Sequence, residues 1–214
     1  MDYKNKSKKY YNNQRTEMSA YLPSFANKII DIGCGDGAFG STLKKNANVE
    51  VWGIELMQEE AMKASKKLDK VLAGNCETLM HELPNDYFDA IYFNDVLEHM
   101  VNPYEVLKFI KSKLSPNGVI ISSIPNMRHY KTFKNLVIDK KWTYTDSGTM
   151  DFTHLRFFTT KSIQEMYLNL GFEIVTHKGI QKTKSIKPYL YNIPLLFSAM
   201  DIFYLQFATV VKVS

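Results

Sequence analysis

Short apolar runs alternate with helix-forming segments along most of this chain, and that alternation constrains the fold more than any other feature. The runs predicted to be strands are 28–32, 50–55, 70–73, 88–93, 118–124, 172–175 and 205–213. Helices are predicted at 38–45, 58–68, 103–114 and 160–170. Strands and helices that alternate at this spacing form βαβ units, whose strands are parallel. The sequence therefore predicts an α/β fold built on a parallel sheet.

A glycine-rich turn follows the first predicted strand, and residues 31–37 read Asp-Ile-Gly-Cys-Gly-Asp-Gly. Glycines let the backbone approach a ligand closely, and ligands of open α/β folds bind at this edge of the sheet. Gly35, Gly37 and Gly40 also satisfy the dinucleotide pattern G-x-G-x-x-G. Glu55 ends the second strand, where an acid can accept both hydroxyls of a ribose. These residues predict a nucleoside-containing cofactor and leave its identity open.

Three further features favour S-adenosylmethionine (SAM) over a dinucleotide. The carboxylate of Asp31 can pair with an ammonium group, whereas it would repel a pyrophosphate. A chain of 214 residues lacks room for a separate substrate domain. Finally, residues 31–37, Glu55, residues 88–99 and residues 114–118 together resemble the ordered motifs of class I SAM-dependent methyltransferases.

The resemblance implies a Rossmann-like, doubly wound sheet of seven strands, mostly parallel with an antiparallel last strand, and helices on both faces. It implies SAM as the cofactor and S-adenosylhomocysteine (SAH) as its product. Members commonly have an aspartate after the third strand to accept the adenine amino group, and Asn75 stands there instead. Its side-chain oxygen can accept the same hydrogen bond. The cofactor-binding residues implied are Asp31, Gly33, Gly35, Gly37, Glu55, Leu56, Asn75, Cys76 and Asn94.

A closer resemblance is to bacterial methyltransferases associated with glycosyltransferases and surface-polysaccharide biosynthesis. It is carried by residues 94–99, 123–130 and 151–159. That family implies O-methylation of a sugar or glycan-related acceptor. Two alternatives stay open: methylation of another small molecule such as a quinone precursor, and a non-catalytic protein that binds SAM.

Candidate catalytic residues follow from the chemistry of a hydroxyl acceptor, which must lose its proton as it attacks. His99 and His154 are the candidate bases because histidine titrates near neutrality. Asp95 is predicted to touch the donor or to orient a histidine. The alternatives are histidines that only hold the backbone or a loop, and an aspartate that only caps a helix.

Predicted substrate-binding residues are His129, Tyr130 and Arg156, the last as a bidentate partner for an anionic acceptor. Arg156 has a salt bridge as its alternative role. Several acids and histidines could cluster in space around a divalent ion, namely Asp95, Glu98, His99, Asp151 and His154. Sequence spacing alone does not show such a cluster, so no metal site is predicted.

The predicted organisation is an N-terminal cap at 1–24 and a methyltransferase domain at 25–214 with inserts at 126–158 and 180–204. Tyr11 and Arg15 are candidate flap residues over the donor, and a mobile tail is the simpler interpretation of that segment. Residues 188–204 are unusually apolar; a core helix is the leading interpretation, with a homodimer surface, a substrate cover, or contact with a membrane or lipid-linked substrate as alternatives. Nucleic acid is not expected, because no long basic stripe is present. Two cysteines without a CxxC pair and an N-terminus without an apolar core predict a cytoplasmic protein.

Overall fold

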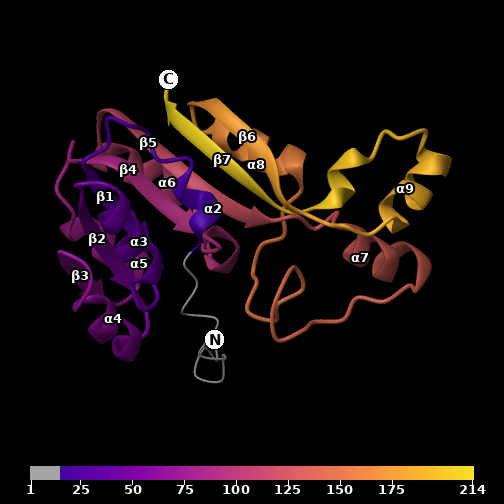
Figure 1. The fold of residues 1–214 in the computed structure, drawn as a ribbon, viewed down its shortest axis with the longest axis horizontal. Coiled ribbons are helices and arrows are strands. Elements are labelled where there is room, and N and C mark those ends of the chain that lie inside the picture. Colours follow the sequence, from indigo (N-terminus) through magenta and orange to yellow (C-terminus); the bar gives the residue numbers. More distant parts are fainter. Residues whose placement is uncertain (1–14) are drawn as a thin grey trace.

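In the computed structural model, which describes residues 15–214, one mixed sheet carries helices on both faces (Figure 1). The strands are β1 (Lys28–Ile32), β2 (Glu50–Glu55), β3 (Lys70–Ala73), β4 (Phe88–Asn94), β5 (Leu114–Pro125), β6 (Phe172–Lys182) and β7 (Tyr204–Val213). Their order is β3-β2-β1-β4-β5-β7-β6, and β7 runs antiparallel to both of its neighbours. The predicted seven-stranded, mostly parallel sheet is confirmed.

The helices are α2 (Thr16–Ser19), α3 (Ala38–Asn46), α4 (Gln58–Ala64), α5 (Cys76–Leu79), α6 (Pro103–Ile110), α7 (Tyr130–Phe133), α8 (Thr160–Asn169) and α9 (Lys187–Asn192). Side-chain caps mark the start of α8 and α6. Thr159 and Ser162 exchange hydrogen bonds as a capping box, and the side chain of Asn102 accepts the N–H of Glu105. Single 3-10 turns occupy Met80–Glu82, Leu97–His99, Lys111–Lys113, Ile193–Leu195 and Met200–Phe203, and a π-helical turn occupies Lys134–Ile138.

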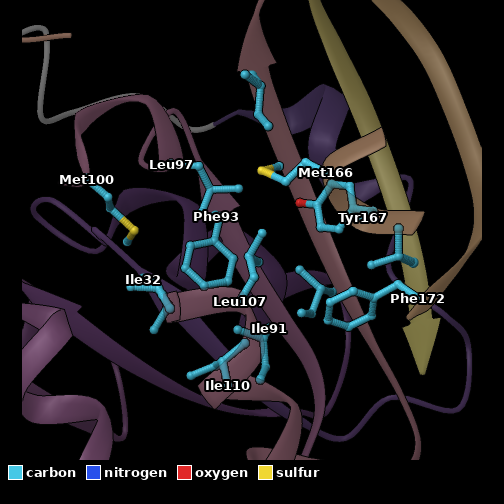
Figure 2. Close-up of a cluster of buried hydrophobic side chains, with 14 of the residues drawn as sticks. Ile32, Ile91, Phe93, Leu97, Met100, Leu107, Ile110, Met166, Tyr167 and Phe172 are labelled. Carbon is cyan, nitrogen blue, oxygen red and sulfur yellow. The ribbon is translucent and has the colours of Figure 1, made fainter. Parts of the chain in front are cut away.

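The central strands send alternate side chains to two separate cores. In β4, Ile91 and Phe93 enter the core under α6 and α8, whereas Ala90 and Tyr92 enter the core under α2, α3 and α4. Figure 2 shows the first core, to which Phe93 of β4, Leu107 of α6 and Met166 of α8 all contribute. Strands buried on both faces read as continuous apolar runs, which is the pattern that predicted them. The central strands are therefore packed on both faces, which fixes the positions of their carboxyl ends.

β6 is longer than predicted, because the expected end at residue 175 is wrong. The strand continues to Lys182, paired with β7 as far as Tyr204, and a register shift lies between Ile174 and Thr176. Residues 176–182 are polar and lack a strand periodicity, so the sequence alone does not predict this extension. Pairing with the long strand β7 supplies its backbone hydrogen bonds.

The segments 126–142 and 183–203, called the accessory lobe here, extend beyond the β6–β7 end of the sheet and include α7 and α9 (Figure 1). A small core of Tyr130, Ala199, Ile202 and Phe203 joins them. The leading prediction of a core helix at 188–204 is wrong for most of its length. Exposed apolar side chains there include Leu190, Ile193, Leu196 and Phe197.

Among the described residues, no helix has the length and apolar character needed to cross a membrane.

Candidate active site

A cavity of about 570 Å³ opens at the carboxyl ends of β1 to β4. The strand order reverses between β1 and β4, and the crevice at such a point is where open α/β sheets bind ligands. The lining includes most of the residues predicted to bind the cofactor: Asp31, Gly33, Gly35, Glu55, Leu56, Asn75, Cys76 and Asn94.

The glycine turn forms the floor of the cavity. Gly33 has φ 74°, and a Cβ there would lie 2.6 Å from a methyl group of Val96. Both its backbone conformation and its packing therefore require glycine. The turn is tied to the second strand, because the N–H of Gly35 donates to a carboxylate oxygen of Glu55 at 2.8 Å.

Asp31, the residue before the last of β1, is a buried carboxylate whose Oδ1 has no hydrogen-bond partner. Burial, followed by the negative charge of Glu55, raises the pKa of Asp31 from 3.8 to about 7. A cationic ligand at this point would replace the solvation that the carboxylate has lost. The neighbouring amide of Asn94 is also buried without a hydrogen-bond partner on either its nitrogen or its oxygen.

Glu55 and Asn75 are held by the backbone around them. The other carboxylate oxygen of Glu55 accepts the N–H of Met57 at 2.8 Å, and Asn75 Oδ1 accepts the N–H of Glu77 at 2.9 Å as the cap of α5. Burial raises the pKa of Glu55. Each oxygen retains a lone pair, so these side chains arrive pre-oriented and can still accept hydrogen bonds from a ligand.

Asp95 follows β4 with φ 56°, a left-handed conformation that turns the chain sharply out of the sheet. Its carboxylate pairs with Arg15 Nη1 at 2.7 Å and accepts from Gln206 Nε2 at 2.8 Å. Arg15 is buried, lines the cavity, and also donates to Ser123. The segment before β1 is thereby fastened to the ends of β4, β5 and β7.

Glu98, His99 and His154 form the second part of the site. The ligating atoms of the three side chains all lie within 4.8 Å of one another. The two imidazole rings are 4.6 Å apart between centroids, and His154 Nε2 lies 3.9 Å from Glu98 Oε1. The loop carrying His154 is held in place because the N–H groups of Leu155 and Arg156 both donate to the carbonyl of Glu98.

Burial sets the protonation of this cluster. Burial and, after it, the neighbouring His154 lower the pKa of His99 to about 4. Burial also raises the pKa of Glu98 well above its ordinary value, with the charge of Asp95 acting in the same direction. His99 is therefore neutral at pH 7 and can accept a proton or a ligand.

A smaller cavity of about 70 Å³ adjoins the cluster. Glu98 and His154 line the smaller cavity, while Asp95, His99 and Gly148 line both cavities. The cluster therefore stands at the boundary between the nucleoside-sized cavity and this smaller space.

Comparison with known proteins decides the family. Residues 3–177 match a protein family described as "Methyltransferase domain". The chain belongs to this methyltransferase family.

Its curated relatives include a ubiquinone biosynthesis O-methyltransferase of Cereibacter sphaeroides (strain ATCC 17029 / ATH 2.4.9), 26% identical over 172 residues that cover 77% of this chain and 67% of the relative. The mitochondrial ubiquinone biosynthesis O-methyltransferase of Schizosaccharomyces pombe is 33% identical over 102 residues, 45% of this chain and 37% of that protein. Among solved structures, a SAM-dependent methyltransferase from Archaeoglobus fulgidus has a TM-score of 0.71 at 19% identity, with 95% of this chain and 96% of that chain covered.

This chain is a SAM-dependent methyltransferase, and the large cavity has features that fit SAM. The unpartnered oxygen of Asp31 suits the ammonium group, the positive-φ glycine at position 33 leaves space that a Cβ would fill, and Glu55 suits the ribose. The individual residue roles remain predictions.

Four predicted residues of the methyltransferase site lie outside both cavities. Gly37 is the N-cap of α3, and Tyr130 is in the core of the accessory lobe. His129 is buried with its ring against Tyr130, and burial lowers the pKa of His129 to about 4. Arg156 is exposed and donates to the carbonyl of Val101, at the rim of the large cavity.

Other lining residues were not predicted from the sequence. Met100 and Val101 form an apolar rim, and Ser147 and Gly148 reach the cavity from the irregular segment between α7 and α8. Gly148 has φ 83°, and an isolated glycine in a polar stretch was the one sequence signal available for it. Of the two predicted flap residues, Arg15 lines the cavity, whereas Tyr11 lies outside the described residues.

Proposed function

We propose that this methyltransferase transfers the methyl group of SAM to a hydroxyl oxygen of a small-molecule acceptor bound beside Glu98, His99 and His154. The observation that carries the proposal is that His99 lines both the large cavity and the small one. SAM supplies an electrophilic methyl group on a sulfonium. The chain itself then has two tasks, which are to align the reacting atoms and to accept or displace the hydroxyl proton.

The residues divide between these tasks. Asp31, Glu55 and Asn75 hold the ammonium, ribose and adenine of the donor. His99 and His154 receive the acceptor hydroxyl, because each Nδ1 lies within hydrogen-bond distance of a backbone carbonyl, and this orients both rings. Asp95, fixed by Arg15, supports the turn that carries the first histidine.

The acceptor class that we propose is a phenolic hydroxyl on an apolar molecule, such as a quinone precursor. The relatives named ubiquinone biosynthesis O-methyltransferases support this class. So does the apolar rim of Met100 and Val101. The sugar acceptor expected from the resemblance is the competing class. His129, Tyr130 and Arg156, predicted to hold it, line neither cavity and so lend it no support.

The accessory lobe is proposed to touch a lipid surface from which such an acceptor is taken. Leu196 is 88% exposed and Ile186 is 71% exposed, which is unusual for large apolar side chains. The two segments of the accessory lobe also carry exposed lysines: Lys131, Lys140, Lys141, Lys184 and Lys187. A lobe that exposes both apolar side chains and cations is suited to an anionic membrane interface.

The deciding experiment supplies purified enzyme with methyl-labelled SAM and a panel of acceptors: hydroxylated aromatics with and without a prenyl tail, nucleotide sugars, and lipid-linked saccharides. Label is expected in the prenylated phenols, with the new methyl ether located by mass spectrometry. Label only in the saccharides would refute the phenolic acceptor. Binding of SAH with no label in any acceptor favours the non-catalytic alternative.

Membrane contact is tested separately by co-sedimentation with vesicles that contain or lack anionic lipid. Binding only to the anionic vesicles is expected, with loss in the Leu196→Asp variant. Size-exclusion chromatography at several concentrations tests the competing use of this surface in a homodimer.

A further inference from the structure

The Glu98–His99–His154 cluster has the arrangement of a metal centre as well as that of a proton acceptor. One carboxylate and two imidazoles place their ligating atoms within 4.8 Å of one another. Ligand atoms around a bound transition metal lie somewhat closer together than this, so small side-chain rotations suffice to close the set.

Hydrogen bonds fix the tautomer of both histidines. His99 Nδ1 lies 3.2 Å from the carbonyl of Thr153, and His154 Nδ1 lies 3.1 Å from the carbonyl of Thr149. A carbonyl can only accept, so each Nδ1 carries the proton and each neutral ring has its lone pair on Nε2. Metal-binding histidines characteristically donate their second nitrogen to a backbone carbonyl or carboxylate in this way.

Glu98 supplies an independent observation. Its side chain is 1% exposed, and neither carboxylate oxygen has a hydrogen-bond partner. Buried carboxylates without hydrogen bonds are costly, and in native proteins they are paired or bound to a metal. His154 Nε2 lies 3.9 Å from Glu98 Oε1, and in the neutral tautomer described above this nitrogen is an acceptor.

We propose that Glu98, His99 and His154 bind one divalent transition-metal ion at the boundary between the two cavities. Two imidazole nitrogens and one carboxylate favour Zn²⁺, Co²⁺, Fe²⁺ or Mn²⁺ over Mg²⁺, which prefers oxygen ligands. Three protein ligands leave coordination positions open, as in catalytic rather than structural metal sites. The small cavity beside Glu98 and His154 provides the space for such positions.

The ion would hold the acceptor oxygen, a role that rests on the proposed function. Coordination of a hydroxyl to a divalent ion lowers the pKa of that hydroxyl, so its proton passes to solvent. An oxygen lone pair then forms the bond to the methyl carbon, and the electron pair of the broken carbon–sulfur bond stays on sulfur, which becomes the neutral thioether of SAH. His99 and His154 would act as ligands in this reaction and not as proton acceptors.

The test is metal binding, independent of any acceptor. Tag-free protein is stripped with chelator and dialysed, and Zn²⁺ and Co²⁺ are titrated by calorimetry, with the visible spectrum of Co²⁺ as a second readout. We expect one ion per chain for the wild type, and at least a tenfold loss of affinity in His154→Ala and Glu98→Gln. His81→Ala, which removes an exposed histidine, is the matched control and is expected to bind as the wild type does.

SAH affinity is measured for each variant to show that the large cavity is intact. If the stripped wild type binds no ion, or if His154→Ala and Glu98→Gln with normal SAH affinity bind it as tightly as the wild type, the metal site is refuted. In that event, loss of turnover in His154→Ala would still support the proposed function, with histidine as the base. A bound ion without turnover of any hydroxylated acceptor would keep the metal site and refute the proposed function.

Discussion

Asp31→Asn is expected to stabilise the protein while it weakens donor binding. Asp31 is buried, its Oδ1 has no hydrogen-bond partner, and burial beside Glu55 raises its pKa from 3.8 to about 7. A carboxyl whose folded-state pKa lies above its unfolded value favours folding only while it is protonated. That contribution is full below pH about 4 and is lost as the pH rises through 7.

The size of the effect follows from the shift. A difference of about three pKa units corresponds to roughly 4 kcal/mol. At pH 8 the wild type carries an ionised Asp31, so the asparagine variant is expected to gain up to roughly 4 kcal/mol in free energy of unfolding. At pH 5 the folded wild type is protonated, and the expected gain falls to roughly 1–2 kcal/mol.

The same substitution is expected to weaken donor binding, because the ammonium group of SAM or SAH needs the charged carboxylate. About half of Asp31 is ionised at pH 7 and about 1% at pH 5, so wild-type affinity is expected to be roughly fiftyfold weaker at pH 5. The asparagine variant should bind weakly at both pH values and lose this pH dependence.

Urea denaturation at pH 5 and pH 8 measures the first effect, and calorimetric titration with SAH measures the second. Asp89→Asn is the matched control, since Asp89 accepts hydrogen bonds from two backbone N–H groups and from Ser115, and its pKa is lowered. That control should lose stability at pH 8. An Asp31→Asn variant that is less stable than the wild type at pH 8, or that binds SAH with undiminished affinity, would falsify the assignment of Asp31.

The other predictions concern the glycine turn after β1, the loop that carries His154, and the accessory lobe. Gly33→Val is expected to abolish SAH binding and to cost roughly 1–3 kcal/mol of stability, because its Cβ would strike Val96 in a left-handed conformation; calorimetry and urea denaturation measure both, and normal affinity contradicts it. His154→Ala is expected to lose turnover by at least about 10²-fold with SAH affinity unchanged, and unaltered turnover would leave that histidine a structural role. Leu196→Asp is expected to leave the free energy of unfolding within about 0.5 kcal/mol, because the side chain is 88% exposed, while vesicle binding falls; a large loss of stability would show that the residue is packed.

The sequence predicted the structure best where a local residue pattern reflects burial or a backbone conformation that only certain residues adopt. The apolar run Ala90-Ile91-Tyr92-Phe93 indicates a strand buried on both faces, and Gly33 marks a turn whose left-handed backbone favours glycine. The predictions of the sheet and of the cavity-lining cofactor residues both followed from such positions. β6 was predicted too short because its extension depends on pairing with β7, a partner distant in sequence.

The proposed acceptor site was harder to predict from the sequence, because contacts between segments distant in sequence bring its residues together. His154 reaches Glu98 because the backbone N–H groups after it dock on the Glu98 carbonyl, a contact that no periodicity encodes. His129 and Tyr130 belong to a segment that carries the same resemblance, yet they line neither cavity. The polar motifs thus identified cavity-lining residues only in part, since some of their residues line a cavity and others pack elsewhere in the fold.

Two buried carboxylates line the two cavities of the site, and each has an oxygen without a hydrogen-bond partner. Asp31 faces the donor cavity, and Glu98 faces the smaller one. Packing cannot account for them, because an apolar residue or an amide would fill either position at a lower cost in solvation. The arrangement is instead suited to binding cations: an ammonium group on one side and, in our proposal, a divalent metal on the other. His99 lines both cavities, so in our proposal the donor and the acceptor would meet beside this residue.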